Sequence, residues 1–427
     1  MRHLRLDYWK PFFSVKPEDR CAGLPDETGD TLSAEIFLNG RVQLCCGDSL
    51  HFLRDQPDGR YDSVVTDPPY ALVSISKRYE TISPRDIVVT NKDPYRRTGR
   101  GFMGKKWDTG ETVFAVEFWQ QVLRVLKPGG HVVAFGGTRT YHRLARAIED
   151  AGFEIRDQLG WCFGSGFPKS HNAGNGWGTA LKPAWEPICL ARKPLIGTVA
   201  ANVLQHGTGA INIDGCRIAS DEVITNHARS GDAVVLFGAN KAQETHQSAG
   251  QALGRWPANI IHDGSDEVVA AFPDLHGAGA ARGEPGGGEF KSETGWGGIG
   301  SGNKGFRIGD ECSAARFFYT AKADADDRLG SKHPTVKPVD LMQWLVRLVT
   351  PKNGLCLDPF AGTGTTAEAC YREGMRCMLV ERETEYQGDI RRRMALVLGG
   401  PEERRRESIK AKNFPIDHGP LFAAAAE

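Results

Sequence analysis

Apolar residues along this chain fall into short continuous runs that are separated by amphipathic stretches. The runs predict strands at 41–46, 61–66, 131–135, 153–163 and 186–191, of which those at 61–66 and 131–135 are expected to be buried. The stretches between them carry apolar residues at helical spacing and predict helices at 49–54, 113–126 and 140–150. This alternation of strand and helix is typical of an α/β fold with a doubly wound, mainly parallel sheet.

The same alternation returns near the end of the chain after a long interruption. Strands are predicted at 354–357 and 375–380, and helices at 338–349, 366–372 and 384–398. Residues 193–315 break the pattern, because they are rich in glycine and hold only short apolar runs, of which 259–262 is the clearest. We therefore expect these residues to form an inserted module.

Charge and cysteine usage narrow the classes of function. The 53 Lys and Arg residues balance 53 Asp and Glu residues, so attraction to nucleic acid must come from local patches. The ten cysteines are scattered, without a C-x-x-C pair or a Cys/His cluster at zinc spacing, which favours a reduced, cytoplasmic protein without a bound metal. No stretch is apolar over the length of a membrane span, and no secretory leader is recognisable.

A turn of four residues follows the strand at 61–66: Asp67, Pro68, Pro69 and Tyr70. Ligands of open α/β sheets bind just beyond the carboxyl ends of strands. Each proline fixes φ and lacks an N–H, so the turn is stiff and offers carbonyl acceptors. A carboxylate and a carbonyl suit the two hydrogens of an exocyclic amino group, while Tyr70 suits stacking on a flat ring. A strand-end turn with a polar cap would show the same residues.

The segment at 71–110 interrupts the α/β pattern. Between residues 77 and 106, nine Lys or Arg residues stand against three Asp or Glu residues, with three aromatic residues among them. Phosphate contacts and base stacking use these residue types. We interpret the segment as a nucleic-acid contact, although a solvated loop without a specific role would have the same composition.

A second strand-end turn combines an acid with closely spaced glycines. It reads Asp358-Pro359-Phe360-Ala361-Gly362-Thr363-Gly364-Thr365, and the next strand ends at Glu381. Such glycines let the backbone approach a ligand, and an acid about 20 residues later reaches ribose hydroxyls. The spacing is that of neither a P-loop nor GxGxxG, and the leading acid favours a cationic amine over a phosphate. S-adenosylmethionine has an amine, a ribose and an adenine but no phosphate; a tight strand–helix turn is the simpler alternative.

The two turns together resemble the permuted β group of DNA amino-methyltransferases, over about residues 40–395. The resemblance implies a Rossmann-like methyltransferase sheet in which the catalytic motif comes first and the cofactor motif last. It divides the chain into an irregular lead-in (1–35), a catalytic half (36–192), a target-recognition module (193–315), a cofactor-binding half (316–398) and a flexible tail (399–427). The two halves are expected to meet in one sheet, because the cofactor half is complete only with the strand at 42–46.

The resemblance also assigns roles to single residues. The catalytic turn, Asp67, Pro68, Pro69 and Tyr70, would hold the target amino group and stack on the flipped base. The implied cofactor residues are Asp48, Asp67, His333, Thr335, Lys337, Asp358, Phe360, Ala361, Gly362, Thr363, Gly364, Thr365 and Glu381. The stretch that holds His333, Thr335 and Lys337 is expected near the cofactor's carboxylate. Asp48 would reach the cofactor's adenine, with a helix cap as its alternative role.

The activity implied is site-specific transfer of a methyl group from S-adenosylmethionine to the N6 of a flipped-out adenine. Cytosine-N4 enzymes share the fold and motif order, and Asp67 favours adenine because many of them have Ser there. RNA or protein-amide methyltransferases and a catalytically inactive DNA-binding protein are further alternatives. Double-stranded DNA is the implied partner, and the group also suggests a homodimer and, in restriction-modification systems, a cognate restriction endonuclease.

Overall fold

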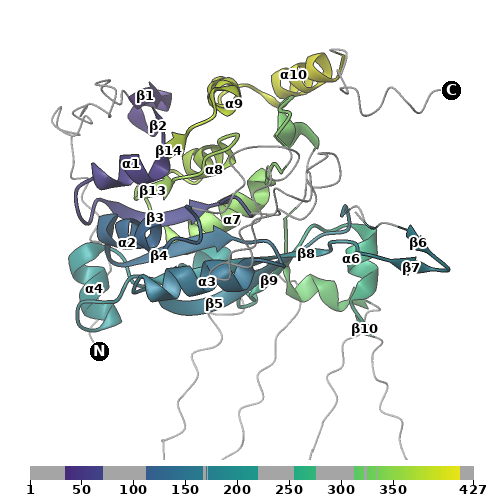
Figure 1. The fold of residues 1–427 in the computed structure, drawn as a ribbon, viewed down its shortest axis with the longest axis horizontal. Helices are drawn as coiled ribbons and strands as arrows, with labels where there is room; N and C mark the ends of the chain where they lie inside the picture. Colours follow the sequence, from purple (N-terminus) through teal and green to yellow (C-terminus); the bar gives the residue numbers. More distant parts are fainter. Residues whose placement is uncertain are drawn as a thin grey trace, which may run out of the picture.

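The computed structural model describes residues 34–70, 112–166, 170, 172–219, 254–275, 312–321, 325–333 and 335–413 (Figure 1). The basic segment 71–110 and most of the predicted lead-in lie outside the described residues. The strands are β1 (Ala34–Phe37), β2 (Val42–Cys46), β3 (Tyr61–Thr66), β4 (Leu126–Phe135), β5 (Glu154–Cys162), β6 (Asn172–Gly174), β7 (Trp177–Gly178), β8 (Trp185–Arg192), β9 (Ile260–His262), β10 (Asp274–Leu275), β11 (Cys312–Ser313), β12 (Tyr319–Thr320), β13 (Leu355–Asp358) and β14 (Arg376–Glu381).

The described helices are α1 (Ser49–Arg54), α2 (Val116–Val125), α3 (Tyr141–Asp150), α4 (Val199–His206), α6 (Asp266–Ala271), α7 (Val339–Val349), α8 (Thr365–Arg372), α9 (Thr384–Leu396) and α10 (Pro401–Asn413). Six of them lie where the apolar spacing predicts a helix, whereas α4, α6 and α10 were not predicted. Four short 3-10 turns complete the described elements: η2 (Leu38–Gly40), η6 (Asp214–Cys216), η7 (Ala314–Phe317) and η8 (Ala325–Arg328).

Ten strands form one mixed sheet, in the order β1-β2-β14-β13-β3-β4-β8-β5-β9-β12. The five strands from β2 to β4 are parallel, which places their carboxyl ends along one edge. β8 runs antiparallel between β4 and β5, so its first residues lie at the edge where the parallel strands end. β1 is antiparallel to β2, whereas β9 and β12 extend the other side of the sheet parallel to β5.

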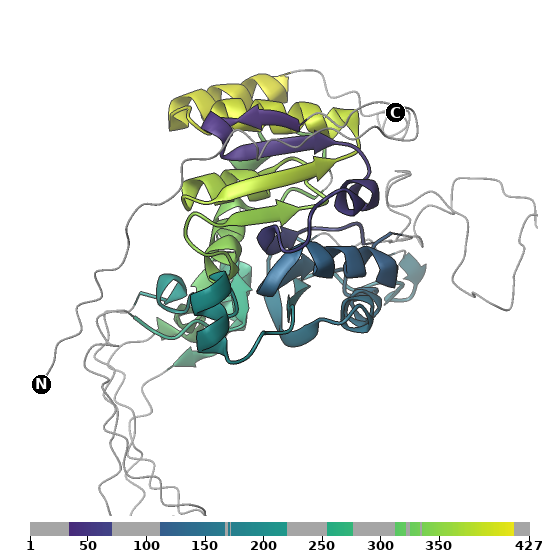
Figure 2. The same ribbon diagram turned by 90° about the vertical axis from the view of Figure 1, so that its left-hand side faces the viewer.

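Strands from the two ends of the chain lie side by side in this sheet, because β14 and β13 stand between β2 and β3 (Figure 2). β14 pairs with β2, with Cys377 opposite Val42, and β13 pairs with β3, with Cys356 opposite Ser63. The predicted union of two distant segments in one sheet is therefore confirmed, as is the doubly wound α/β class.

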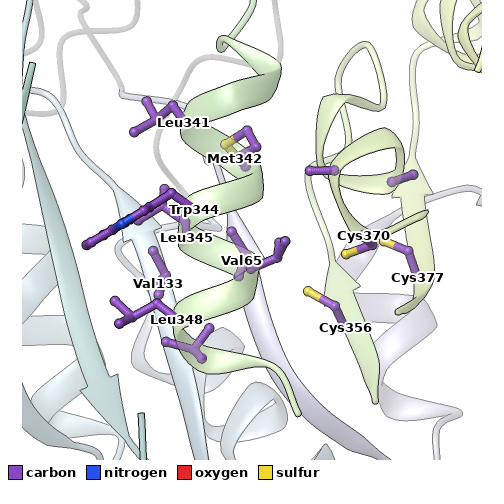
Figure 3. Packing of buried hydrophobic residues seen from close by; sticks show 14 of the residues in the cluster. Val65, Val133, Leu341, Met342, Trp344, Leu345, Leu348, Cys356, Cys370 and Cys377 are labelled. Carbon is purple, nitrogen blue, oxygen red and sulfur yellow. The ribbon is translucent and has the colours of Figure 1, made fainter. Parts of the chain in front are cut away.

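Helices cover both faces of the sheet and bury a hydrophobic cluster on each. One cluster joins the sheet to α1, α2 and α3, and the other joins it to α7, α8 and α9. Figure 3 shows α7, with Leu345 and Leu348, against Val65 of β3 and Val133 of β4. Burial of each such side chain contributes roughly 1.5–3 kcal/mol. The clusters therefore fix the central strands, and with them the positions of the turns at their ends.

Strand β4 and the hairpin β6–β7 also differ from the predicted pattern. The pattern predicts a stop at 127–130 and a strand at 131–135, whereas β4 runs through Leu126–Phe135. The pairing register of β3 with β4 shifts between Tyr61 and Ser63, so residues 127–130 form a bulge in which Gly129 has a φ of +76°. The hairpin β6–β7 was not predicted either, although Asn175 and Gly176, with φ of 53° and 80°, are typical of a tight hairpin turn.

The described parts of the predicted module 193–315 lie against the sheet. The amide of Asn202, in α4, donates hydrogen bonds to the carbonyls of Pro128 and Thr208, and β9 is itself a strand of the main sheet. The rest of the module lies outside the described residues. Residues 401–413, predicted as part of a flexible tail, form α10, and its Arg404 lies 2.6 Å from the buried carboxylate of Glu368.

Within the described ranges, no helix is both long and apolar enough to cross a bilayer. No group of three or more His, Cys, Asp or Glu residues in those ranges is arranged as a set of metal ligands. Cys356, Cys370 and Cys377 are free thiols, and Figure 3 shows their sulfur atoms gathered between β13, α8 and β14.

Candidate active site

The two turns that the sequence singles out leave the sheet side by side. The first follows β3, the second follows β13, and these strands are neighbours that run in the same direction. The hydroxyl of Thr66, the last residue of β3, donates a hydrogen bond of 2.7 Å to Asp358, the last residue of β13. A buried contact thus joins two motifs that are 292 positions apart.

Asp358 organises the glycine-rich turn. Besides the bond from Thr66, its carboxyl group accepts hydrogen bonds from the Phe360 N–H at 3.1 Å and the Thr366 hydroxyl at 2.5 Å. Burial raises the pKa of Asp358 to about 7, although the hydroxyl donors act in the opposite direction. The carboxyl group therefore holds the turn together, and the cofactor contact predicted for it stays a prediction.

The glycines of the turn adopt a conformation that other residues rarely take. Gly362 and Gly364 have φ of +52° and +78°, in the left-handed region. A Cβ atom on Gly362 would lie 3.5 Å from Nε2 of His333, so the glycine keeps the space beside that ring free of a side chain. The Thr363 carbonyl accepts a 2.8 Å hydrogen bond from Arg393 of α9, which fixes the turn from behind.

Three predicted cofactor residues of this turn pack against the protein. The ring of Phe360 lies 5.2 Å, centroid to centroid, from that of Phe118 in α2. Ala361 is buried, and its N–H donates to the carbonyl of Val380 over 3.0 Å. Thr365 begins α8, with its hydroxyl 3.3 Å from that of Thr363. These contacts shape the turn.

Glu381 ends β14 beside the same turn. Its side chain accepts a hydrogen bond from the N–H of Gly362 and another from the N–H of Glu383, each at 2.8 Å. Burial raises the pKa of Glu381 to about 7, against the effect of these two N–H donors. The Glu381 carbonyl also accepts from the N–H of Gly47, so the end of β2 adjoins the site.

Asp48 follows Gly47 and caps α1. Its Oδ1 accepts hydrogen bonds from the N–H groups of Leu50 and His51, at 2.9 and 3.1 Å. The alternative role weighed from the sequence, a helix cap, is therefore observed. Asp48 is exposed at the carboxyl edge, and its predicted contact with the cofactor's adenine stays a prediction.

His333 and Thr335 belong to the segment that precedes α7, and His333 lies beside the glycine-rich turn. His333 is buried, with its ring edge-on to Tyr386 at 4.5 Å between centroids, and its Nδ1 is 3.0 Å from the Thr335 carbonyl. Thr335 itself is exposed. The ring of His333 lies beside Gly362, and the predicted place of this stretch near the cofactor's carboxylate stays a prediction.

Lys337 reaches the catalytic turn. Its Nζ lies 3.0 Å from Oδ2 of Asp67, 2.8 Å from Oε2 of Glu186 and 3.0 Å from the hydroxyl of Tyr70. Burial would lower the pKa of Lys337, but the carboxylates of Asp67 and Glu186 raise it above its ordinary value. The geometry therefore puts this ammonium group beside Asp67 and Tyr70, the predicted catalytic residues.

The other carboxylate oxygen of Asp67, Oδ1, is buried and has no hydrogen-bond partner among the described residues. Pro68 is buried and Pro69 is half-buried. The carbonyl of Tyr70 accepts a hydrogen bond of 2.9 Å from Thr140, which ties the end of the turn to the start of α3. A stiff turn thus presents one carboxylate oxygen without a partner.

The sequence analysis did not identify Glu186 as a residue of the site. It is the second residue of β8, next to an apolar run that reads as an ordinary buried strand. An isolated acid at the start of such a run was the available signal. The direction of β8 in the sheet could not be read from the sequence. Only its antiparallel pairing with β4 brings the start of β8 to the edge where the parallel strands end.

These observations define a class of protein: a doubly wound α/β fold in which an Asp-Pro-Pro-Tyr turn and an acidic, glycine-rich turn leave neighbouring strands. Comparison with known proteins identifies the family. Residues 61–392, more than half of the chain, match the N6_N4_Mtase family model, described as DNA methylase. The chain belongs to this family of N6/N4 DNA methylases, whose members depend on S-adenosylmethionine.

Single relatives match shorter stretches. The chain is 34% identical to the type II methyltransferase M.HindIII of Haemophilus influenzae over 23% of its own length and 38% of that protein. It is 40% identical to the putative methylase YubD of Escherichia coli over 15% of its length and 29% of that protein. The chain therefore spans less than half the length of these relatives.

Solved structures align over more of the chain at lower identity. The cytosine-N4-specific PvuII DNA methyltransferase aligns over 87% of this chain and 93% of its own, with 15% identity and a TM-score of 0.45. M1.HpyAVI aligns over 83% and 98%, with 13% identity and a TM-score of 0.39. Sequence identities and TM-scores this low do not show which base this protein methylates.

Proposed function

We propose that this protein transfers a methyl group from S-adenosylmethionine to the exocyclic N6 of adenine in DNA. One observation supports the proposal above the others. Asp67 keeps one buried oxygen without a partner, while Lys337 holds the other. The glycine-rich turn leaves the neighbouring strand. An acceptor for an amino hydrogen thus stands beside the turn that suits the cofactor.

The second turn fits S-adenosylmethionine. The left-handed Gly362 and Gly364 leave the backbone accessible, and the space between Gly362 and His333 is free of a side chain. The residues that would hold the cofactor are those predicted from the sequence, from Asp48 beside β2 to Glu381 at the end of β14. When bound, the cofactor supplies a methyl group on a positively charged sulfur.

The catalytic turn would act on the amino group of the base. The lone pair of that nitrogen is shared with the ring, which makes the nitrogen a poor nucleophile. When Asp67 and the carbonyl of Pro68 accept its two N–H bonds, the nitrogen can become tetrahedral and its lone pair would be free to bond the methyl carbon, while the bond from that carbon to sulfur breaks and leaves its electron pair on sulfur as a neutral thioether. Positioning and acceptors preorganised for the positive charge on nitrogen lower the barrier. The surplus proton then passes along the hydrogen bond to Asp67.

The target base must leave the duplex, since its N6 is otherwise within the stack. Tyr70 is the proposed stacking partner, and contacts to its carbonyl from Thr140 and to its hydroxyl from Lys337 fix it at both ends. Base–aromatic stacking contributes roughly 1–3 kcal/mol per base. The segment 71–110 and much of the middle module, for which DNA contacts are predicted, fall outside the described residues.

Adenine is proposed over cytosine because the first residue of the catalytic turn is Asp67, where many cytosine-N4 enzymes have Ser. Double-stranded DNA is the proposed partner. A homodimer and a cognate restriction endonuclease are further proposals, which rest on the resemblance to the β group.

Mass spectrometry of nucleosides tests the proposal directly. Duplex DNA that lacks methylated bases is incubated with the purified full chain and S-adenosylmethionine carrying a deuterated methyl group, then digested to nucleosides. We expect deuterated N6-methyldeoxyadenosine. Deuterated N4-methyldeoxycytidine would overturn the choice of base, and label found only in added RNA or protein would overturn the DNA methyltransferase proposal.

A further inference from the structure

Glu186 is an acid that neither motif contains, and it lies within the proposed catalytic cluster. Its Oε2 is 2.8 Å from Nζ of Lys337 and accepts a hydrogen bond of 3.2 Å from the hydroxyl of Tyr70. The side chain is 18% exposed, and that of Lys337 is 5% exposed, so water screens this ion pair only weakly. Glu186 therefore contacts both the ammonium group and the ring that face the target base in the proposed reaction.

The topology of the sheet brings Glu186 to this position. β8 is antiparallel to β4, with Ile188 opposite Phe135, so the first residues of β8 lie where β4 ends. The N–H of Gly136, just beyond β4, donates a hydrogen bond of 2.9 Å to the carbonyl of Pro187. This contact fixes the backbone next to Glu186 relative to the catalytic edge.

The charges of the cluster explain why a second acid is needed. If Lys337 faced Asp67 alone, its ammonium group would neutralise the carboxylate that must accept an amino hydrogen. With Glu186 at 2.8 Å and Asp67 at 3.0 Å, the ammonium group is shared between two carboxylates. The cluster keeps one net negative charge, which suits a reaction that develops positive charge on the amino nitrogen.

We propose that Glu186 is a positioning residue of the methyl transfer, an inference that rests on the proposed function and deepens it. Glu186 holds Lys337 away from Oδ1 of Asp67 and fixes the hydroxyl of Tyr70. Asp67 thereby keeps one carboxylate oxygen as a charged acceptor that no described group of the protein occupies. Without the Glu186 charge, Lys337 moves onto Asp67 and weakens that acceptor, while the cofactor turn is unchanged.

The test compares Glu186→Gln with a matched control, Glu154→Gln, on the neighbouring strand β5. Arg192, the last residue of β8, pairs with Glu154 at 2.6 Å, away from the active edge, so Glu154→Gln removes an ion-paired acid outside the site. We expect Glu186→Gln to lower the single-turnover methylation rate about 10- to 100-fold, by analogy with the partners that orient metal ligands, whose loss has effects of this size. Glu154→Gln should keep the wild-type rate.

Two further measurements separate positioning from general damage to the structure. The Kd for S-adenosylmethionine from calorimetry and the Tm should match the wild-type values within error for Glu186→Gln. In addition, Glu186→Gln combined with Lys337→Met should lose no more rate than Lys337→Met alone, because Glu186 acts through that ammonium group. Multiplicative losses, or a Kd that rises in proportion to the loss of rate, would overturn the positioning role.

A readout that does not need methylation is the titration of Tyr70. Burial, Asp67 and Glu186 raise the pKa of its hydroxyl well above the ordinary value. Carbon-13 NMR of ring-labelled tyrosine should show a lower pKa for Tyr70 in Glu186→Gln than in the wild type. An active wild type with an unaffected Glu186→Gln variant would overturn this inference, whereas an inactive wild type with the expected shift in Tyr70 would overturn the proposed function alone.

Discussion

The hydroxyl of Thr66 donates a 2.7 Å hydrogen bond to the carboxyl group of Asp358, and both residues are buried at the ends of neighbouring strands. The residue after Thr66 is the proposed catalytic acid Asp67, and Asp358 begins the glycine-rich turn. The bond therefore sets the spacing between the acceptor for the amino group and the turn that would hold the methyl donor. Methyl transfer depends on that spacing, because reacting atoms must be held close together and in line.

Thr66→Val tests this contact, because valine keeps the shape of threonine and removes its donor. We expect the free energy of unfolding to fall by about 1–3 kcal/mol, since a buried carboxyl group loses a hydrogen bond. The methylation rate should fall as well. Thr66→Ser keeps the hydroxyl and serves as the control, and urea denaturation measures both variants. A valine variant as stable and active as the wild type would show that the contact is unimportant.

Asp67→Asn tests the proposed acceptor at constant size. The amide can still accept one hydrogen bond but carries no charge, so it stabilises the developing positive charge poorly. We expect the rate of N6-methyladenine formation to fall by about 100-fold or more, and Asp67→Ala to abolish it, while calorimetry finds S-adenosylmethionine bound to both variants. Normal turnover by Asp67→Ala would refute the catalytic assignment.

The sequence predicts the parts of the fold that depend on continuous apolar runs. β3 and β13 are such runs, and the acids at their ends, Asp67 and Asp358, could be placed at one edge because parallel strands end together. The bulge in β4 could not be predicted in the same way. Lys-Pro-Gly-Gly reads as a stop, and only the pairing with β3 shows that the strand continues through it.

The sequence predicts site residues only where they belong to a recognisable motif or make local contacts. The contacts of Lys337 with Asp67 and Glu186 join side chains that lie far apart in sequence, and no spacing rule connects them. Asp48 shows the opposite case, since its capping bonds are local and were weighed as an alternative from the residues alone. Local hydrogen bonds can be read from a sequence, whereas contacts made by tertiary packing cannot.

The raised pKa of Glu381 predicts how stability depends on pH. Its folded-state pKa, about 7, lies above the ordinary 4.5, so the folded protein binds the proton more tightly than the unfolded chain. The contribution of Glu381 to stability is therefore fully present below pH 4.5 and is lost as pH rises through about 7. Glu381→Gln removes this contribution and should flatten the decline in unfolding free energy over that window.

Urea denaturation at a series of pH values measures the effect, with Glu154→Gln as the control. Asp358, whose pKa is also raised to about 7, contributes a decline of the same sign, so some slope should remain in Glu381→Gln. A slope equal to that of the wild type would contradict the assignment of a buried, proton-retaining carboxyl group to Glu381.

Gly137→Ala tests the position of Tyr70 from outside the catalytic turn. A Cβ atom on Gly137 would lie 3.2 Å from Cβ of Tyr70 and 3.2 Å from the hydroxyl of Thr140, closer than side chains normally approach. The alanine should therefore shift Tyr70 by a few tenths of an ångström, at a cost of about 1–3 kcal/mol in stability. If Tyr70 stacks on the flipped base, the methylation rate must fall while the affinity for S-adenosylmethionine stays unchanged.

Gly388→Ala is the matched control for the same chemical change. Gly388 lies inside α9, and a Cβ atom there would meet nothing within 4 Å. Alanine is the better helix former, so this variant should gain about 0.5–1 kcal/mol in unfolding free energy and keep the wild-type methylation rate. Loss of rate in Gly137→Ala but not in Gly388→Ala would locate the effect at Tyr70. Equal rates in both variants would mean that a displaced Tyr70 still serves the reaction, and the proposed stacking role would then be wrong.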